Sequence, residues 1–128
     1  MKDKVKYWIE LSDYDLITAS AMLKSSRYLY VGFMCHQTIE KLFKALFVFQ
    51  QGEEPPYSHN LSYIAKKGGF YKHFNERQKS FIDQIEPLNI EARYPTNKER
   101  LLKSLDKTKC KELIKGTKEL QQWIKMKL

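Results

Sequence analysis

The sequence predicts an all-α fold, a bundle of four to five helices. Apolar residues recur at three- and four-residue spacing along most of the chain, which is the period of an α-helix with a buried face. No stretch alternates apolar and polar residues as a half-buried strand does. The link between the two longest helical stretches is short, which favours antiparallel neighbours. We therefore expect one domain, residues 1–128, with a single core.

The first long helix is expected over residues 2–25. Ser25 and Ser26 form its expected end, so only a few residues separate it from the next helix. Its buried stripe is expected to contain Val5, Trp8, Ser12, Leu16, Ala19 and Leu23.

The stretch from Tyr28 to Gln50 is the longest apolar-rich run and predicts a helix with neighbours on more than one side. Its charged residues make it a poor membrane span. Glu40 and Lys44 have the i,i+4 spacing of a favourable ion pair. Its main apolar face contains Cys35, Ile39, Leu42, Leu46 and Phe49. The opposite side is expected to line an interface or a cleft through Gln37, Glu40, Lys41 and Lys44.

Prolines and glycines divide the next part of the chain. The double-proline loop at residues 52–58 interrupts the helical pattern, because proline removes backbone donors and restricts the residue before it. Ser58 is expected to cap a short third helix over residues 59–67, and Gly68-Gly69 is expected to end it.

Asn75 and Gln78 form a capping-box pattern for a fourth helix, from residue 76 to about residue 86. Pro87 is expected to disturb this helix. We expect residues 88–97 to form a helical end or a turn, followed by an extended segment.

Asp106 is expected to cap a last helix, from residue 107 to about residue 127. Residues 101–105 are ambiguous, either a short helical turn or the lead-in to this helix. Gly116 costs about 1 kcal/mol relative to alanine in a helix, so we expect it to permit the close approach of another helix. The expected buried stripe is Cys110, Leu113, Ile114, Thr117, Leu120, Trp123 and Ile124.

The net charge of +8 is concentrated near the end of the chain. Residues 97–128 contain ten Lys and Arg but four Asp and Glu, which accounts for six of the eight charges. A basic face attracts RNA, DNA, nucleotides or an acidic protein. Charge alone favours a simpler explanation, which is a solvated lysine face that keeps a small protein soluble.

Cysteine and histidine give no metal or cofactor signature. Cys35 and Cys110 lie at apolar helical positions, which predicts two reduced, buried thiols in a cytoplasmic protein. Two Cys and three scattered His lack the spacing of a zinc site, and no glycine-rich phosphate loop is present. His36 is expected at the surface or an interface. The first 15 residues contain acids and no apolar core, unlike a secretory signal.

The sharpest local feature is Arg93-Tyr94-Pro95. A guanidinium held beside a proline suits a phosphate or carboxylate contact. Equally, Arg93 can tie an irregular segment to helix-end carbonyls or to Glu40. The candidate anion-binding set is Arg93, Tyr94, Lys44 and His59, although His59 also suits the simpler task of capping the third helix.

Taken together, these motifs resemble the HEPN family of small helical domains. The resemblance covers essentially the whole chain, and its most specific part is Gln-x-x-Glu-Lys-x-x-Lys-Ala, followed by His-x-Leu and Arg-Tyr-Pro. The matching residues are Trp8, Ala19, Tyr30, the run Cys35–Leu46, Pro56, Ser58–Leu61, Ala92–Pro95 and Trp123-Ile124.

The resemblance implies an up-and-down bundle, commonly a homodimer. Such domains occur in prokaryotes beside, or fused to, minimal nucleotidyltransferases, often as toxin–antitoxin pairs. Many members are ribonucleases that need no metal. Their motif is an Arg followed, after four to six residues, by a His, and the site is shared across the dimer.

This chain departs from the family's ribonuclease motif. At the required distances after Arg93 stand Lys98, Glu99 and Arg100, and no histidine has an arginine at that distance upstream. The resemblance therefore implies a non-catalytic homodimeric module that partners a minimal nucleotidyltransferase and binds nucleotide or RNA. Two alternatives stay open: a divergent ribonuclease that uses Arg93 with Tyr94, His59 or His36, and a purely structural or regulatory dimer.

Overall fold

A computed structural model describes residues 2–93, 99–100 and 103–128, with the backbone alone at residues 90–93. The described residues form helices and no strands, which confirms the predicted all-α bundle. Within them, no helix is both long and apolar enough to cross a membrane. The elements are α1 (Lys2–Lys24), α2 (Tyr28–Gln51), α3 (Leu61–Lys67), the 3-10 turn η1 (Tyr71–His73), α4 (Glu76–Arg93) and α6 (Lys107–Lys125).

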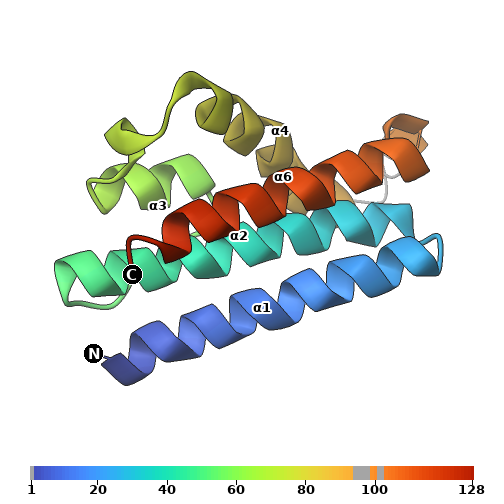
Figure 1. Cartoon of the computed structure of the whole chain (residues 1–128). Coiled ribbons are helices and arrows are strands. Elements are labelled where there is room, and N and C mark those ends of the chain that lie inside the picture. Colours follow the sequence, from blue (N-terminus) through green and yellow to red (C-terminus); the bar gives the residue numbers. More distant parts are fainter. Residues whose placement is uncertain (1, 94–98, 101–102) are drawn as a thin grey trace.

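Helix α2 is the centre of the bundle. It contacts α1, α3, α4 and α6, and 15 of its 24 residues are buried. Figure 1 shows α1 running antiparallel to α2 at one edge of the bundle, while α3, α4 and α6 lie on the other sides of α2. The prediction that α2 has neighbours on more than one side is confirmed.

Aromatic side chains fill one end of the core. The ring of Phe43 on α2 lies 5.5 Å, between centroids, from both Phe70 and Phe74, which flank η1. Phe74 in turn lies 5.5 Å from the ring of Trp123 on α6. Phe43, Phe70 and Phe74 are buried, so these rings join α2, the η1 segment and α6 through contacts that exclude water.

The cap of α3 differs from its prediction. The side chain of Asn60 accepts a hydrogen bond from the backbone N–H of Tyr63 at 2.9 Å, so Asn60 is the N-cap and α3 begins at Leu61. Ser58 instead accepts from the backbone N–H of Asn60 at 3.0 Å. Both residues have a capping side chain, and the path of the double-proline loop decides which one meets the helix. Gly69, at φ +78°, follows the end of the helix as predicted.

The predicted caps of α4 and α6 are confirmed. The side chain of Asn75 accepts from the backbone N–H of Gln78 at 2.8 Å, and the side chain of Gln78 accepts from that of Asn75 at 2.9 Å. Asp106 caps α6 by accepting from the backbone N–H of Lys109 at 2.7 Å. These caps depend only on neighbours in the sequence, which is why the sequence predicts them well.

The expected end of the fourth helix, at about residue 86, is wrong. Helix α4 continues through Pro87 to Arg93, so residues 88–93 form a helical end, one of the two conformations that the sequence left open, and not a turn. Pro87 lacks a backbone donor, but Ile85, Leu88 and Asn89 around it are buried, and α4 packs on α2. This tertiary packing offsets the lost hydrogen bond. Residues 94–98 of the predicted extended segment lie outside the described part of the chain.

Gly116 permits the predicted close approach of another helix. A Cβ atom built at this position would lie 2.4 Å from Cε1 of Phe81 on α4, far inside van der Waals contact. Helices α4 and α6 therefore meet where α6 has no side chain. Of the ambiguous segment 101–105, residues 103–104 are helical and residue 105 is not.

Candidate functional site

Helix α2 carries three ionisable side chains into the interior of the protein. His36, Glu40 and Lys44 are 0%, 1% and 8% exposed. Their four-residue spacing places them on one face of the helix. Burying such groups is unfavourable unless each finds a partner, and each of them does.

Glu40 is at the centre of this network of polar side chains. Its Oε2 accepts from Nζ of Lys44 at 3.1 Å, which confirms the predicted i,i+4 pair. Its Oε1 lies 2.9 Å from Nδ1 of His59 and 3.7 Å from Nδ1 of His36. The predicted pair is buried rather than exposed. Glu40 therefore fixes the segment that precedes α3 to the central helix.

Glu86 on α4 extends this network of polar side chains to a second helix. Its Oε2 lies 3.2 Å from Nε2 of His36, and its Oε1 accepts from the backbone N–H groups of Leu61 at 2.7 Å and Ser62 at 3.3 Å. One carboxylate thus binds the first turn of α3 and the imidazole of α2. The expectation that His36 lies at the surface or an interface is wrong, because Glu86 makes its burial favourable.

Lys44 also lines an aromatic recess. Its Nζ lies 5.4 Å from the ring centroid of Trp8, within the range of a cation–π contact. The indole N–H of Trp8 is buried and has no hydrogen-bond partner among the described residues. The recess has a volume of about 680 Å³ and is lined by Asp3, Lys4, Tyr7, Trp8, Lys44, Glu54, Pro55, Pro56 and Tyr57.

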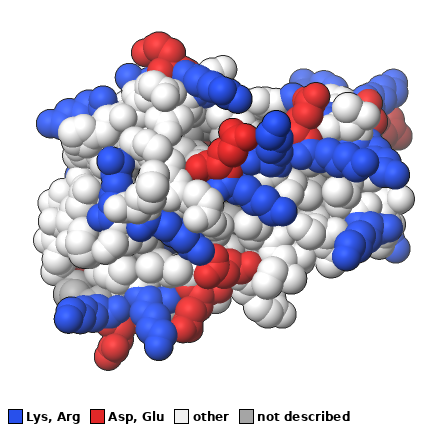
Figure 2. Space-filling view, viewed as in Figure 1, with Lys and Arg blue, Asp and Glu red and all other residues white. Residues whose placement is uncertain are grey.

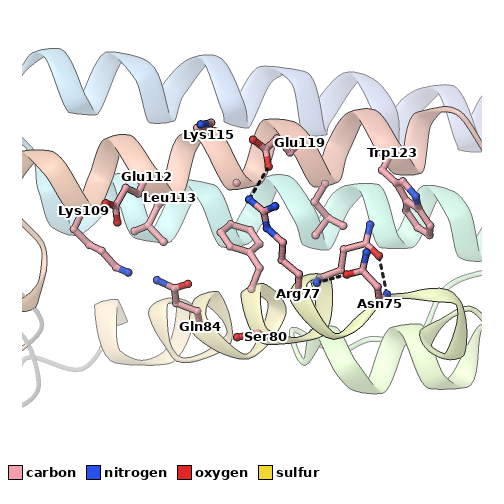
Figure 3. A pocket seen from close by; sticks show the side chains of 14 residues that line it. Asn75, Arg77, Ser80, Gln84, Lys109, Glu112, Leu113, Lys115, Glu119 and Trp123 are labelled. Atoms are coloured by element: carbon pink, nitrogen blue, oxygen red, sulfur yellow. Dashed lines mark hydrogen bonds and ion pairs between the residues drawn. The ribbon is translucent and has the colours of Figure 1, made fainter.

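A second recess, of about 670 Å³, lies between α4 and α6 (Figure 3). Arg77 reaches from α4 to Glu119 on α6 at 4.0 Å, but both side chains are exposed, so this ion pair contributes little. Figure 3 shows Lys109 extending across the recess toward Gln84. Its lining mixes polar side chains with Phe81, Leu113, Leu120 and Trp123, and it includes Gly116, which lies against Phe81.

The outer side of α6 carries a row of exposed lysines, which we call the lysine face: Lys107, Lys111, Lys115 and Lys118. Steps of three and four residues place them on one side of the helix. None of them forms an ion pair within 4.0 Å in the described part of the chain, whereas Lys125 on the same helix binds Asp13 at 2.6 Å. Figure 2 shows basic side chains across the side where α6 lies, with acidic side chains among them.

The structure brings together two of the four residues in the candidate anion-binding set. Lys44 and His59 meet through Glu40. The side chain of Arg93, at the end of α4, and the whole of Tyr94 lie outside the described residues.

The side chains that were predicted to line an interface or cleft on α2 contact other residues of this same chain. Gln37 is partly buried, with its Oε1 3.4 Å from Nδ1 of His36. Nζ of Lys41 donates to Asp15 of α1 at 3.0 Å. Glu40, as described above, is enclosed.

Sequence reasoning missed Asp15 and Glu86. Asp15 had a signal, since an acid stands beside the apolar stripe of the first helix, three residues after Ser12. Glu86 had none, because its partners lie 24 to 50 residues away and only the fold brings them near.

Both cysteines are free, buried thiols. Burial raises the pKa of Cys35 to about 12 and that of Cys110 to about 11. The reactive thiolate is therefore rare at neutral pH, and neither cysteine suits a nucleophilic role.

Comparisons with known proteins agree with this architecture. Residues 5–127 match the family model of the HEPN domain. The fold is similar to the crystal structure of TT1696 from Thermus thermophilus, with a TM-score of 0.83, 16% identity and 98% of each chain covered, and at that identity the likeness shows the fold alone. No curated protein matches the chain. Because the family model spans all but the first four residues and the last one, the chain belongs to the HEPN domain family.

Proposed function

We propose that this protein is a non-catalytic binding module that forms a homodimer, pairs with a minimal nucleotidyltransferase and binds nucleotide or RNA. The lysine face of α6 carries the proposal. Its four ammonium groups are exposed and are not neutralised by an acid within ion-pairing distance among the described residues. Exposed ammonium groups of this kind bind the phosphates of a nucleic acid favourably, because binding releases the counterions of the nucleic acid. Arg93 and Tyr94 stay in the proposed anion-contacting set because of their sequence pattern.

The absence of a ribonuclease motif supports a binding role over catalysis. No histidine follows an arginine at the family's spacing in this sequence. His36 is enclosed between Glu86 and Glu40, where no phosphate can reach it. We therefore expect RNA to remain intact after long incubation with the pure protein.

Changing all four residues of the lysine face to glutamine is expected to weaken binding of single-stranded RNA roughly tenfold or more at low salt. Each lost phosphate contact also makes the plot of log affinity against log salt shallower by about 0.7. Fluorescence anisotropy with a labelled oligonucleotide, repeated over a salt series, measures both quantities.

The matched control changes Lys2, Lys66, Lys67 and Lys72 to glutamine. These lysines are exposed and lie on other elements, so the control removes the same charge. Equal weakening in the two variants would show that net charge, not the lysine face, drives binding. Absence of RNA and nucleotide binding by the unmodified protein at low salt would contradict the nucleic-acid part of the proposal.

The proposed protein partner is tested separately. The proposed partner, a minimal nucleotidyltransferase, is expected to co-purify with this protein and to give a calorimetric binding signal. If the two proteins form no complex at low salt, the partnership is refuted, whatever the outcome with RNA.

A divergent ribonuclease is the second candidate, and His59 is the observation that favours it. The buried carboxylate of Glu40 holds Nδ1 of His59 at 2.9 Å, while half of the imidazole is exposed. An imidazole oriented by a carboxylate is an arrangement that proton transfer uses. Cleavage that is lost in His59→Ala and kept in His73→Ala would support this candidate, and intact RNA with the unmodified protein would exclude it.

A further inference from the structure

The recess beside Trp8, which we call the Trp8 recess, has flat and apolar walls. It lies between the start of α1, Lys44 of α2 and the double-proline loop. Its volume of about 680 Å³ falls within the range of roughly 300–1,000 Å³ that is typical of small-molecule sites. Most of its described lining consists of aromatic rings and prolines, namely Tyr7, Trp8, Pro55, Pro56 and Tyr57. Walls of this kind favour a planar molecule that can stack against them.

Two hydrogen-bond donors of the Trp8 recess lack a full set of acceptors. The ammonium of Lys44 has three N–H groups, and its one acceptor among the described residues is Glu40, at 3.1 Å. The indole N–H of Trp8 is buried and has no acceptor among them. These donors belong to neighbouring side chains, because Nζ of Lys44 lies 5.4 Å from the ring centroid of Trp8. A molecule that brings an acceptor to them therefore binds more favourably than one without.

The charges around the Trp8 recess offer little to a charged molecule. Lys44 is paired with Glu40, and Nζ of Lys4 lies 2.8 Å from Glu54. The remaining charged residue of the described lining, Asp3, is acidic. An anion would lose its hydration here without meeting surplus positive charge, and a cation would come beside the ammonium of Lys44. A neutral molecule avoids both penalties.

We propose that the Trp8 recess binds a neutral, planar ring that carries a hydrogen-bond acceptor, such as a carbonyl oxygen or a ring nitrogen. The ring lies against the aromatic walls, and its acceptor meets the donors of Lys44 and Trp8. This inference goes beyond the proposed function, because the described lining of the recess contains no residue of the lysine face. Lys44 serves here as a donor to a neutral group, whereas the sequence suggested a contact with an anion.

The first test compares four probes of similar size. Benzamide is neutral and carries a carbonyl acceptor, benzoate is an anion, benzylamine is a cation at neutral pH, and toluene has no acceptor. We expect benzamide to bind with a dissociation constant of about 1 mM, and the other three to bind about fivefold more weakly or worse.

The indole N–H resonances measure this binding in an NMR titration. Trp8 and Trp123 are the two tryptophans of the chain, so one resonance reports the recess and the other serves as an internal control. A Trp123→Phe variant keeps a single indole resonance and so assigns the two. We expect benzamide to shift the Trp8 resonance to saturation, and to shift that of Trp123 less.

Removing one wall tests the place of binding. Tyr57 is fully exposed, so Tyr57→Ala should keep the thermal unfolding curve of the unmodified protein. The dissociation constant of benzamide should rise about threefold or more in this variant, because a ring contact is lost. The matched control is Tyr14→Ala, which removes an exposed tyrosine of α1 that does not line the recess and should leave binding unchanged.

Nucleosides and aromatic amides both have the proposed chemistry. Adenosine and nicotinamide are therefore compared in the same titration, and the one that binds more tightly identifies the source of the ligand. Benzoate that binds more tightly than benzamide would contradict a neutral ligand, and equal effects of Tyr57→Ala and Tyr14→Ala would contradict the recess. A Trp8 resonance that stays in place up to the solubility limit of benzamide would overturn the proposal. None of these results depends on RNA binding by the lysine face.

Discussion

Replacing Glu40 with alanine is expected to lower the free energy of unfolding by about 3–5 kcal/mol, the range for removing one partner of a buried ion pair. The carboxylate is 2% exposed and binds Lys44, whose side chain is 10% exposed. Without Glu40, that ammonium stays buried with no carboxylate partner, and the imidazole of His59 loses its hydrogen-bond partner. Urea unfolding followed by circular dichroism measures the loss.

Two further variants separate the ion pair from simple loss of volume. Glu40→Leu with Lys44→Met removes both charges, so this double variant should be more stable than Glu40→Leu alone. Glu10→Ala removes an exposed glutamate and should change stability by about 0.5 kcal/mol or less. If Glu40→Ala lowered the free energy of unfolding no more than Glu10→Ala does, the network of polar side chains around Glu40 would not stabilise the fold.

Replacing Phe43 with alanine is expected to cost about 3–5 kcal/mol, the range for removing a large core aromatic side chain. Phe43 is fully buried, and its ring meets Phe70 and Phe74. Its loss opens a cavity where α2 joins the η1 segment. The midpoint of urea unfolding should fall accordingly.

Phe49→Ala is the matched control for this prediction. It makes the same chemical change on the same helix, but Phe49 is 51% exposed, so the expected cost is within about 0.5 kcal/mol. Equal losses for the two variants would contradict the described position of α2 in the core.

The sequence by itself predicted the order of the helices, the caps of α4 and α6, and the family. The pairing of Asn75 with Gln78, the cap at Asp106 and the glycines after α3 act within a few residues, so a linear reading can find them. The apolar period also identified α2 as a helix with several neighbours, which the structure confirms.

Only the tertiary structure decided which polar groups meet. A helical period shows the side of a helix on which a residue lies, but not the helix that faces that side. His36 is therefore buried, because Glu86 reaches it from 50 residues away. For the same reason α4 passes through Pro87, since packing against α2 outweighs a local preference.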